Sequence, residues 1–348
     1  METLKDFTVE GIYKGIEAVG NGEDGRSSNR LSECHVTSRF EKTQTTFTYF
    51  ILLGFQNSKD LQILITLIFL VIYCMIFLGN LMIIVLVSYN KTLQSPMYFF
   101  LTQLSTNDIL LTTVIIPNTL YVSLNDVGTI SFAGCITQFY FFGASETSEC
   151  LLLTVMSYDR YLAICNPLRY SVLMDRWLCL KLVIVSWILS FSAILIDTLS
   201  LSRLEYCRSN IIDHFFCDLD PLLEISCSDT YFLQLEVSLL STPLVVMPFL
   251  MIVISYVFII FSILKIQSKA GRQKAFSTCS SHLSVVIMFY GALIGIYVLP
   301  SGEQTLDAGK ILSLSYTVVI PLLNPIIYSL RNKEIKEALK KVIKKTIM

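Results

Sequence analysis

The chain has 348 residues, of which 53% are hydrophobic and 15% are charged. Soluble domains carry about 25% charged residues, so this composition excludes an ordinary soluble enzyme, a disordered scaffold and a coiled coil. The net charge of −1 offers no basic excess for binding nucleic acid, and an integral membrane protein is the class that remains.

Residues 1–60 are expected to form an extracellular N-terminal segment. Residues 1–40 are polar and show neither a helical nor a strand period, so we expect them to be disordered. They contain no apolar core typical of a cleavable signal peptide. The first membrane span is therefore expected to act as the targeting signal.

Seven apolar segments follow, each of the length that a helix needs to cross a bilayer, which is about 20 residues. They predict an all-α membrane protein with a seven-transmembrane helix bundle over residues 61–331. Paired repeats of the kind that build many transporters are not visible in these segments. The expected spans cover about residues 63–87, 96–120, 132–160, 182–201, 235–264, 275–299 and 311–330.

The distribution of Lys and Arg predicts how the bundle is oriented. Basic residues concentrate in the loops after the first, third and fifth spans and in residues 332–348. The loops between spans on the opposite side carry only Arg203, Arg208 and Lys310. Because basic loops stay in the cytoplasm, we expect a multi-pass plasma-membrane protein with its N-terminus extracellular and its C-terminus cytoplasmic.

The tail, residues 332–348, places apolar side chains at helical spacing between lysines. Ile335, Leu339, Val342 and Ile343 would share one face. This pattern predicts a short amphipathic helix that lies on the anionic inner leaflet of the bilayer.

Four cysteines are expected on the extracellular side. Cys135 begins the third span, and Cys207, Cys217 and Cys227 lie in the loop after the fourth. Four cysteines allow three pairings. A bridge from Cys135 to the loop would fold the loop over the mouth of the bundle and roof a cavity.

Four strings, in this order on the second, third, sixth and seventh spans, resemble one family closely. They are PMYFFL at 96–101, MSYDRYLAIC at 156–165, KAFSTCSSH at 274–282 and PLLNPIIY at 321–328. The chain resembles an odorant receptor of the rhodopsin-like G-protein-coupled class over about residues 45–345. The resemblance implies disulfides Cys135–Cys217 and Cys207–Cys227.

The resemblance also implies a function without enzymatic activity or a cofactor. The partners would be a small-molecule odorant, the lipid bilayer and a heterotrimeric G protein of the stimulatory olfactory type, with a rise in cyclic AMP as the output. One alternative is a non-sensory receptor on the same scaffold, for a metabolite or a peptide. A channel or carrier is a second alternative.

In the family, the ligand cavity lies in the outer half of the bundle, between spans three, five and six. Burial of apolar surface, at roughly 25 cal/mol per Å², would supply most of the affinity for a small volatile molecule. Helical spacing and this placement give the candidate ligand-binding residues Phe142, Gly143, Glu146, Thr147, Leu240, Ser241, Leu244, Leu293, Ile294 and Tyr297.

Glu146 is an unusual residue for such a cavity, because an ionisable group at membrane depth is costly. We hypothesise that it hydrogen-bonds a polar group of the ligand, such as an amine. The alternative is a protonated acid bonded to Ser241 or Thr147.

A polar relay is expected deeper in the bundle. The family packs the first, second and seventh spans together, which would bring Asn80 and Asn324 to Asp108, with Glu149 beside them. The relay would rearrange on activation, and Na⁺ at Asp108 and Glu149 is a further hypothesis. The alternative is one protonated acid that hydrogen-bonds within the bundle.

The candidate switch residues lie where the third, fifth and seventh spans approach the cytoplasm. Asp159 would hold the Arg160 guanidinium at rest and release it toward Tyr256, Tyr328 and a G-protein helix. The alternatives are a simple ion pair at the helix end, or an Arg160 side chain that extends its charged group to the membrane surface. Pro325 would bend its helix and free carbonyls for Asn324 or water. The full set is Asp159, Arg160, Tyr161, Tyr256, Asn324, Pro325 and Tyr328.

Overall fold

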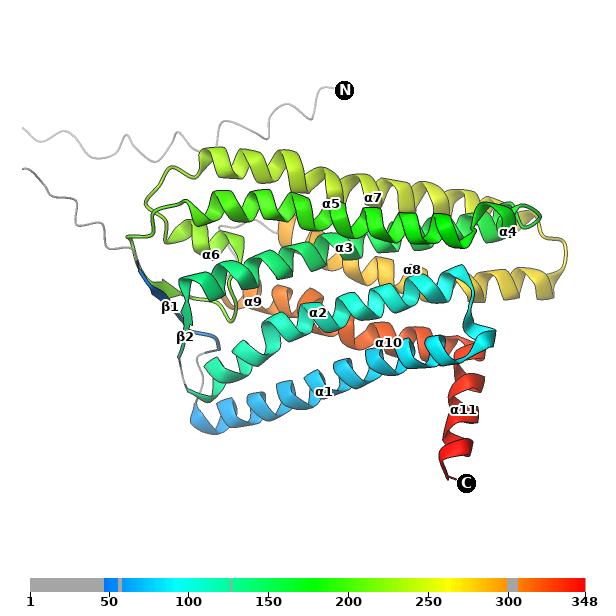
Figure 1. The fold of residues 1–348 in the computed structure, drawn as a ribbon, viewed down its shortest axis with the longest axis horizontal. Coiled ribbons are helices and arrows are strands. Elements are labelled where there is room, and N and C mark those ends of the chain that lie inside the picture. Colours follow the sequence, from blue (N-terminus) through cyan, green and yellow to red (C-terminus); the bar gives the residue numbers. More distant parts are fainter. Residues whose placement is uncertain (1–46, 56–57, 126, 299–305, 348) are drawn as a thin grey trace, which may run out of the picture. The chain divides into compact units, whose positions relative to one another are not determined.

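The computed structural model describes residues 47–55, 58–125, 127–298 and 306–347. The disorder predicted for residues 1–40 concerns a part of the chain outside these ranges. Within them, long helices run side by side along one direction and form a bundle (Figure 1).

Seven long helical segments make up the bundle, which confirms the predicted fold class. Six are single helices: α1 (Lys59–Tyr89), α2 (Pro96–Leu124), α3 (Phe132–Cys165), α5 (Arg176–Ser202), α7 (Tyr231–Lys265) and α8 (Lys269–Val298). The seventh segment joins α9 (Leu306–Leu314), the π-helical turn η2 (Ser315–Val319) and α10 (Ile320–Arg331). Shorter helices are η1 (Lys91–Leu93), α4 (Tyr170–Leu173), α6 (Leu219–Glu224) and α11 (Lys333–Ile347).

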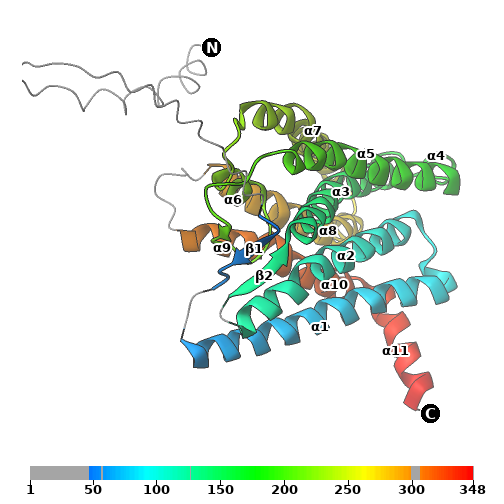
Figure 2. The same cartoon turned by 60° about the vertical axis from the view of Figure 1, so that its left-hand side comes forward.

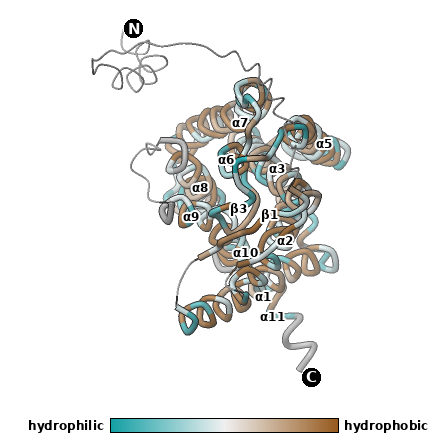
Figure 3. The backbone as a smooth tube through the Cα atoms, turned by 90° about the vertical axis from the view of Figure 1, so that its left-hand side faces the viewer, coloured by the Kyte–Doolittle hydropathy of each residue, from teal (hydrophilic) through white to brown (hydrophobic). Residues whose placement is uncertain are grey.

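The bundle is apolar on its outside, as a lipid-embedded protein must be. In α1, Leu64, Leu67, Val71 and Leu78 are all more than half exposed, whereas Asn80 is fully buried. Hydrophobic colouring runs along the helices in Figure 3. Within the described residues, α1, α2, α5, α7 and the stretch Gly309–Ser329 are long and apolar enough to cross a membrane, and α8 holds a shorter apolar stretch, Cys279–Gly295.

A small sheet closes one end of the bundle and was not expected from the sequence. Strand β1 (Tyr49–Leu52) pairs antiparallel with β2 (Gly128–Ser131) and parallel with β3 (Ile211–Ile212). The sheet joins the N-terminal segment to the loops before α3 and after α5 (Figure 2). We call this the sheet end, and the opposite end, from which α11 projects, the α11 end.

Pro325 lies where the seventh segment packs on α1. Proline has no N–H, so the Pro321 carbonyl lacks its intrahelical donor, and Asn80 Nδ2 donates to it at 3.2 Å. We expected Asn324 or water in this role, and the structure corrects this to Asn80. Gly79 makes the approach possible, because a Cβ there would lie 3.2 Å from the Pro325 ring.

The predicted amphipathic tail helix is α11, and its start is anchored to the bundle. Asn332 Oδ1 accepts hydrogen bonds from the backbone of Glu334 at 2.9 Å and of Ile335 at 3.2 Å, as an N-cap does. Tyr98 donates to Glu334 at 2.8 Å. Ile335 is 1% exposed, so the apolar face of α11 begins against the bundle.

Candidate ligand pocket and signalling site

The loop between α5 and α7 is tied down by the two predicted disulfides, which the structure confirms. Cys135 at the start of α3 is bonded to Cys217, and Cys207 to Cys227. Gln138, one turn after Cys135, accepts a hydrogen bond from the Cys217 backbone at 2.9 Å. The chain around Cys217 is therefore held on α3 by a covalent bond and a hydrogen bond.

Two phenylalanines of this loop fill the mouth of the bundle. Phe215 and Phe216 are fully buried. The Phe216 ring lies 4.9 Å from that of Phe142 on α3, and the Phe215 ring stacks at 5.4 Å on Phe55 of the N-terminal segment. The loop thus forms a lid whose inner surface is aromatic, which is the roof that a Cys135 bridge led us to expect.

Lys310 of α9 locks the lid to the seventh segment. Its Nζ lies 2.6 Å from Asp213 Oδ1 and donates to the Gly54 carbonyl at 2.9 Å. Lys310 is only 4% exposed, and a buried cation is tolerated when it is paired and hydrogen-bonded. Sequence reasoning missed this contact, although a lone lysine at the start of an apolar span was a signal for it.

Two titratable groups of the lid are perturbed by burial in opposite ways. Burial, followed by the nearby positive charge of Lys310, lowers the pKa of His214 to about 4. Burial raises the pKa of Asp218 to about 6, with the neighbouring Asp220 adding to the effect. The lid therefore favours a neutral imidazole and disfavours an ionised Asp218.

The predicted pocket residues of α3 do not all face the same way. Phe142 is buried and lies 6.0 Å from the ring of Tyr316 in the seventh segment. Gly143 faces α5 instead, since a Cβ there would lie 3.1 Å from Ile194. The Thr147 hydroxyl donates to the Gly143 carbonyl at 2.9 Å, so it is engaged within its own helix.

The predicted residues of α7 and α8 are also divided. Leu240, Leu244 and Leu293 are half-buried, as pocket-lining side chains would be. Ile294 is 48% exposed and shares the outer face of α8 with Ile287, so the structure does not bring it together with the others. The side chain of Tyr297 lies outside the part that the structure describes.

The Glu146 side chain is half-buried, with both carboxylate oxygens shielded from solvent. Neither carboxylate oxygen has a hydrogen-bond partner among the described residues. The two alternative partners are engaged elsewhere, Thr147 with Gly143 and Ser241 with Asp197 Oδ2 at 2.5 Å. Glu149 follows three residues later in the same helix. A site of this kind can accept a proton or a cation.

Of the residues predicted for the polar relay, Asp108 and Asn324 lie in contact. Asn324 Nδ2 lies 3.2 and 3.1 Å from the two Asp108 carboxylate oxygens. Asn80 does not join them, because its amide donates to Ile76 and Pro321. Glu149 is fully buried near Asp108, and its oxygens have no hydrogen-bond partner in the described chain.

Asp159 and Arg160 form a buried ion pair at the α11 end of α3. Arg160 Nε donates to Asp159 Oδ2 at 2.8 Å, and Nη2 contacts the same oxygen. Tyr170 of α4 donates to the other oxygen at 2.7 Å. Sequence reasoning did not find Tyr170, since a single tyrosine in a short loop helix carries no periodic signal.

Tyr256 contacts a histidine to which the sequence analysis assigned no role. Its hydroxyl lies 2.7 Å from Nδ1 of His282, whose Nε2 lies 3.1 Å from the Leu153 carbonyl of α3. Both rings are buried, and they stack 8° from parallel. His282 therefore joins α8 to α3 and α7 at once.

The remaining switch residues surround this contact. Tyr161 lies 6.0 Å from the ring of Phe258 on α7. Tyr328 is buried, and its hydroxyl has no hydrogen-bond partner within the described ranges. Arg160 is thus held by Asp159, while Tyr256 bonds His282 and Tyr328 stays unbonded.

The sequence of the chain is similar to those of known proteins along most of its length. A family model described as "Olfactory receptor" matches residues 69–346. The chain is similar to human olfactory receptor 11L1, with 48% identity over 86% of the chain and 94% of that protein. It is 47% identical to rat olfactory receptor 1500 over 86% of the chain and 96% of the relative. It is 44% identical to human olfactory receptor 5I1, over 88% and 98% respectively. The chain therefore belongs to the olfactory receptor family of G-protein-coupled receptors.

Proposed function

We propose that the chain detects small odorant molecules outside the cell and activates a heterotrimeric G protein of the stimulatory olfactory type, which raises cyclic AMP. In this proposal the sheet end and residues 1–60 are extracellular, and the α11 end, with residues 332–348, is cytoplasmic. The excess of Lys and Arg in the loops at the α11 end supports this orientation. Family membership carries the proposal.

The ligand would bind beneath the lid, in the half of the bundle nearest the sheet. Phe142 and the half-buried Leu240, Leu244 and Leu293 would supply apolar contact, with Phe216 as the roof. Glu146 would be the polar group that orients the ligand, because its carboxylate oxygens are buried and unbonded. Such a pocket, mostly apolar with few polar groups, suits small neutral odorants and amines.

The relay would connect this pocket to the α11 end. Asp108 and Glu149 are buried acids without a cationic partner among the described residues. Their oxygens are the ligands that a hard cation prefers, so the pair fits Na⁺. A bound cation would stabilise the arrangement in which Asn324 contacts Asp108, and its loss would free the seventh segment to move.

Signalling would require two contacts at the α11 end to open. Arg160 would leave Asp159, and His282 would leave the Leu153 carbonyl, so that α8 could move away from α3. A G-protein helix would then reach Arg160. The His282 contact supports this account because it ties α8 to α3, and the Asp159 carboxylate occupies the Arg160 guanidinium.

A cyclic AMP reporter assay with a chemically diverse odorant panel tests the proposal. It is run in cells that have the stimulatory olfactory α subunit and in cells that lack every stimulatory α subunit. We expect concentration-dependent responses only in the first. Odorant-gated current or uptake in the cells without the α subunit would instead indicate a channel or carrier.

A further inference from the structure

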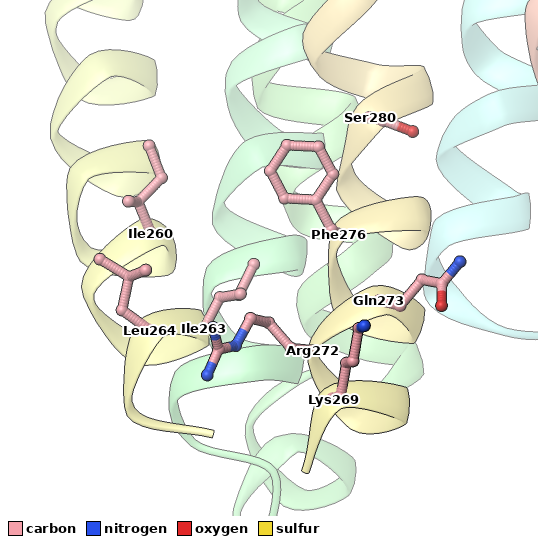
Figure 4. A pocket seen from close by; sticks show the side chains of 8 residues that line it. All are labelled: Ile260, Ile263, Leu264, Lys269, Arg272, Gln273, Phe276 and Ser280. Atoms are coloured by element: carbon pink, nitrogen blue, oxygen red, sulfur yellow. The ribbon is translucent and has the colours of Figure 1, made fainter. Parts of the chain in front are cut away.

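A cleft of about 930 Å³ lies between α7 and α8 at the α11 end of the bundle. Ile260 and Leu264 of α7 form one wall, and Phe276 of α8 forms the other. Figure 4 shows Phe276 and Arg272 directed toward α7, whereas Gln273 points to the other side of α8. The cleft therefore has apolar walls, and the cationic side chains of Lys269 and Arg272 lie at its mouth.

The cleft opens onto the outer surface of the bundle. Ile260, Leu264 and Phe276 are 49%, 61% and 61% exposed. Phe276 lies on the same helical face as Ile287, which is 63% exposed. An apolar cleft on this face of a membrane protein is in contact with lipid.

The side chains of α8 that point inward are different ones. Cys279 and His282 are buried, and His282 contacts α3. The α8 side chains that line the cleft are therefore not the ones that contact α3.

Two cations stand at the mouth of the cleft, and among the described residues neither forms an ion pair. Lys269 and Arg272 are exposed, and the sequence contains no Asp or Glu from residue 237 to residue 302. Arg272 Nη2 donates to the Ile266 carbonyl at 3.2 Å. A guanidinium has five N–H donors in a planar fork, so others remain for a ligand.

We propose that this cleft binds one anionic phospholipid of the cytoplasmic leaflet. The lipid phosphate lies between Lys269 and Arg272, and one acyl chain packs along Ile260, Leu264 and Phe276. Basic pockets between helices on the cytoplasmic side suit anionic headgroups, and Arg matches phosphate geometry. The inference rests on the proposed orientation of the bundle. The bound lipid contacts both helices that the Tyr256–His282 bond joins.

Native mass spectrometry tests the site without odorant or G protein, so its outcome is independent of signalling. Full-length receptor is released from nanodiscs of phosphatidylcholine that contain a minor fraction of phosphatidylinositol bisphosphate, and the retained lipid is identified. We expect selective retention of the anionic lipid. The double variant Lys269→Gln/Arg272→Gln should retain it about 25-fold less, or about fivefold for each lost cation.

Matched variants separate headgroup recognition from folding and chain packing. Arg176 is an exposed arginine where α5 begins, at the α11 end of the bundle. The variant Arg176→Gln should retain the lipid like the wild type. Phe276→Asn should weaken retention while thermal unfolding stays unchanged. Soluble inositol trisphosphate, which has the headgroup without chains, should not displace the lipid.

Three results would overturn the inference. The first is equal lipid retention by the wild type and the double variant. The second is displacement by inositol trisphosphate, which would show that the apolar walls are not used. The third is a double variant that keeps the lipid but loses G-protein binding, which would make the cleft a protein-docking surface.

Discussion

Lys310 Nζ of the seventh helical segment lies 2.6 Å from Asp213 Oδ1 of the lid. The two residues are 97 positions apart, and the same ammonium group donates to Gly54 of the N-terminal segment. One buried cation thus joins the three parts of the chain that close the sheet end.

Lys310→Met should lower the thermal stability of the receptor, because it leaves Asp213 without its cation. Removing one partner of a buried ion pair costs about 3 kcal/mol at the lower end of the observed range. The lower end applies here because the Asp213 side chain is 35% exposed. Thermal unfolding of purified receptor measures the loss. Arg203→Gln, an exposed cation at the same end, should unfold like the wild type. Unchanged unfolding of Lys310→Met would contradict the role of this pair.

His282→Phe should raise basal cyclic AMP about 30-fold at equal surface expression. The variant keeps an aromatic ring but removes the bonds to Tyr256 and Leu153, each worth about 1 kcal/mol, so α8 separates from α3 more often. Tyr256→Phe, which removes one hydroxyl, should have a smaller effect. Ile287→Ala, on the outer face of the same helix, should leave basal activity unchanged. A silent His282→Phe receptor that still responds to odorant would exclude the bridge as a restraint.

Glu146→Gln should weaken responses to amines by about 10- to 100-fold, which corresponds to the loss of one charge-assisted hydrogen bond. Neutral odorants should keep their potency, because apolar contacts supply their affinity. Concentration–response curves over a matched series of amines and alcohols measure the difference. Glu236→Gln is the control, since that acid bonds Ser200 at 3.0 Å outside the proposed pocket. An unchanged ranking of amines and alcohols would rule out amine recognition by Glu146.

Acidification should affect two lid variants in opposite directions. His214 has a lowered pKa, so its neutral form stabilises the fold and this stability is lost as the pH falls from about 6.5 to about 4. Asp218 has a raised pKa, so the fold gains stability as the pH falls through about 6 toward the usual range of a carboxyl. In the wild type the two effects oppose each other.

Asp218→Asn leaves only the histidine effect and should unfold at a lower temperature at pH 4.5 than at pH 7. His214→Gln leaves only the carboxyl effect and should show the opposite trend. Melting curves of both variants over this pH range measure the trends. The two variants following the same trend would show that these groups do not control the lid.

The sequence predicted the helices well because lipid leaves a chain few choices. Backbone groups at membrane depth must bond within their own segment, so apolar segments of sufficient length predicted the bundle. The Asp159–Arg160 ion pair could also be predicted, because the two residues are adjacent in the sequence. The disulfides followed from the resemblance to a family and were confirmed.

Contacts between distant segments could not be derived in the same way, because they depend on how each helix is rotated about its axis. Asn80 was expected at Asp108. It instead donates to the carbonyl of Pro321, which Pro325 leaves without a donor and which lies 241 positions further along the chain. His282 reaches Leu153 across 129 positions. Ile294 and Gly143 lie on helices predicted correctly but on faces directed elsewhere.

Replacing Arg160 tests most directly whether the lidded bundle signals through a G protein. Wild-type receptor, Arg160→Ala and the surface control Arg176→Ala are compared at equal surface expression in the cyclic AMP assay, with an odorant that activates the wild type. We predict that Arg160→Ala binds the odorant but produces no cyclic AMP, while Arg176→Ala responds fully. A full response from Arg160→Ala would contradict coupling through the Asp159–Arg160 switch.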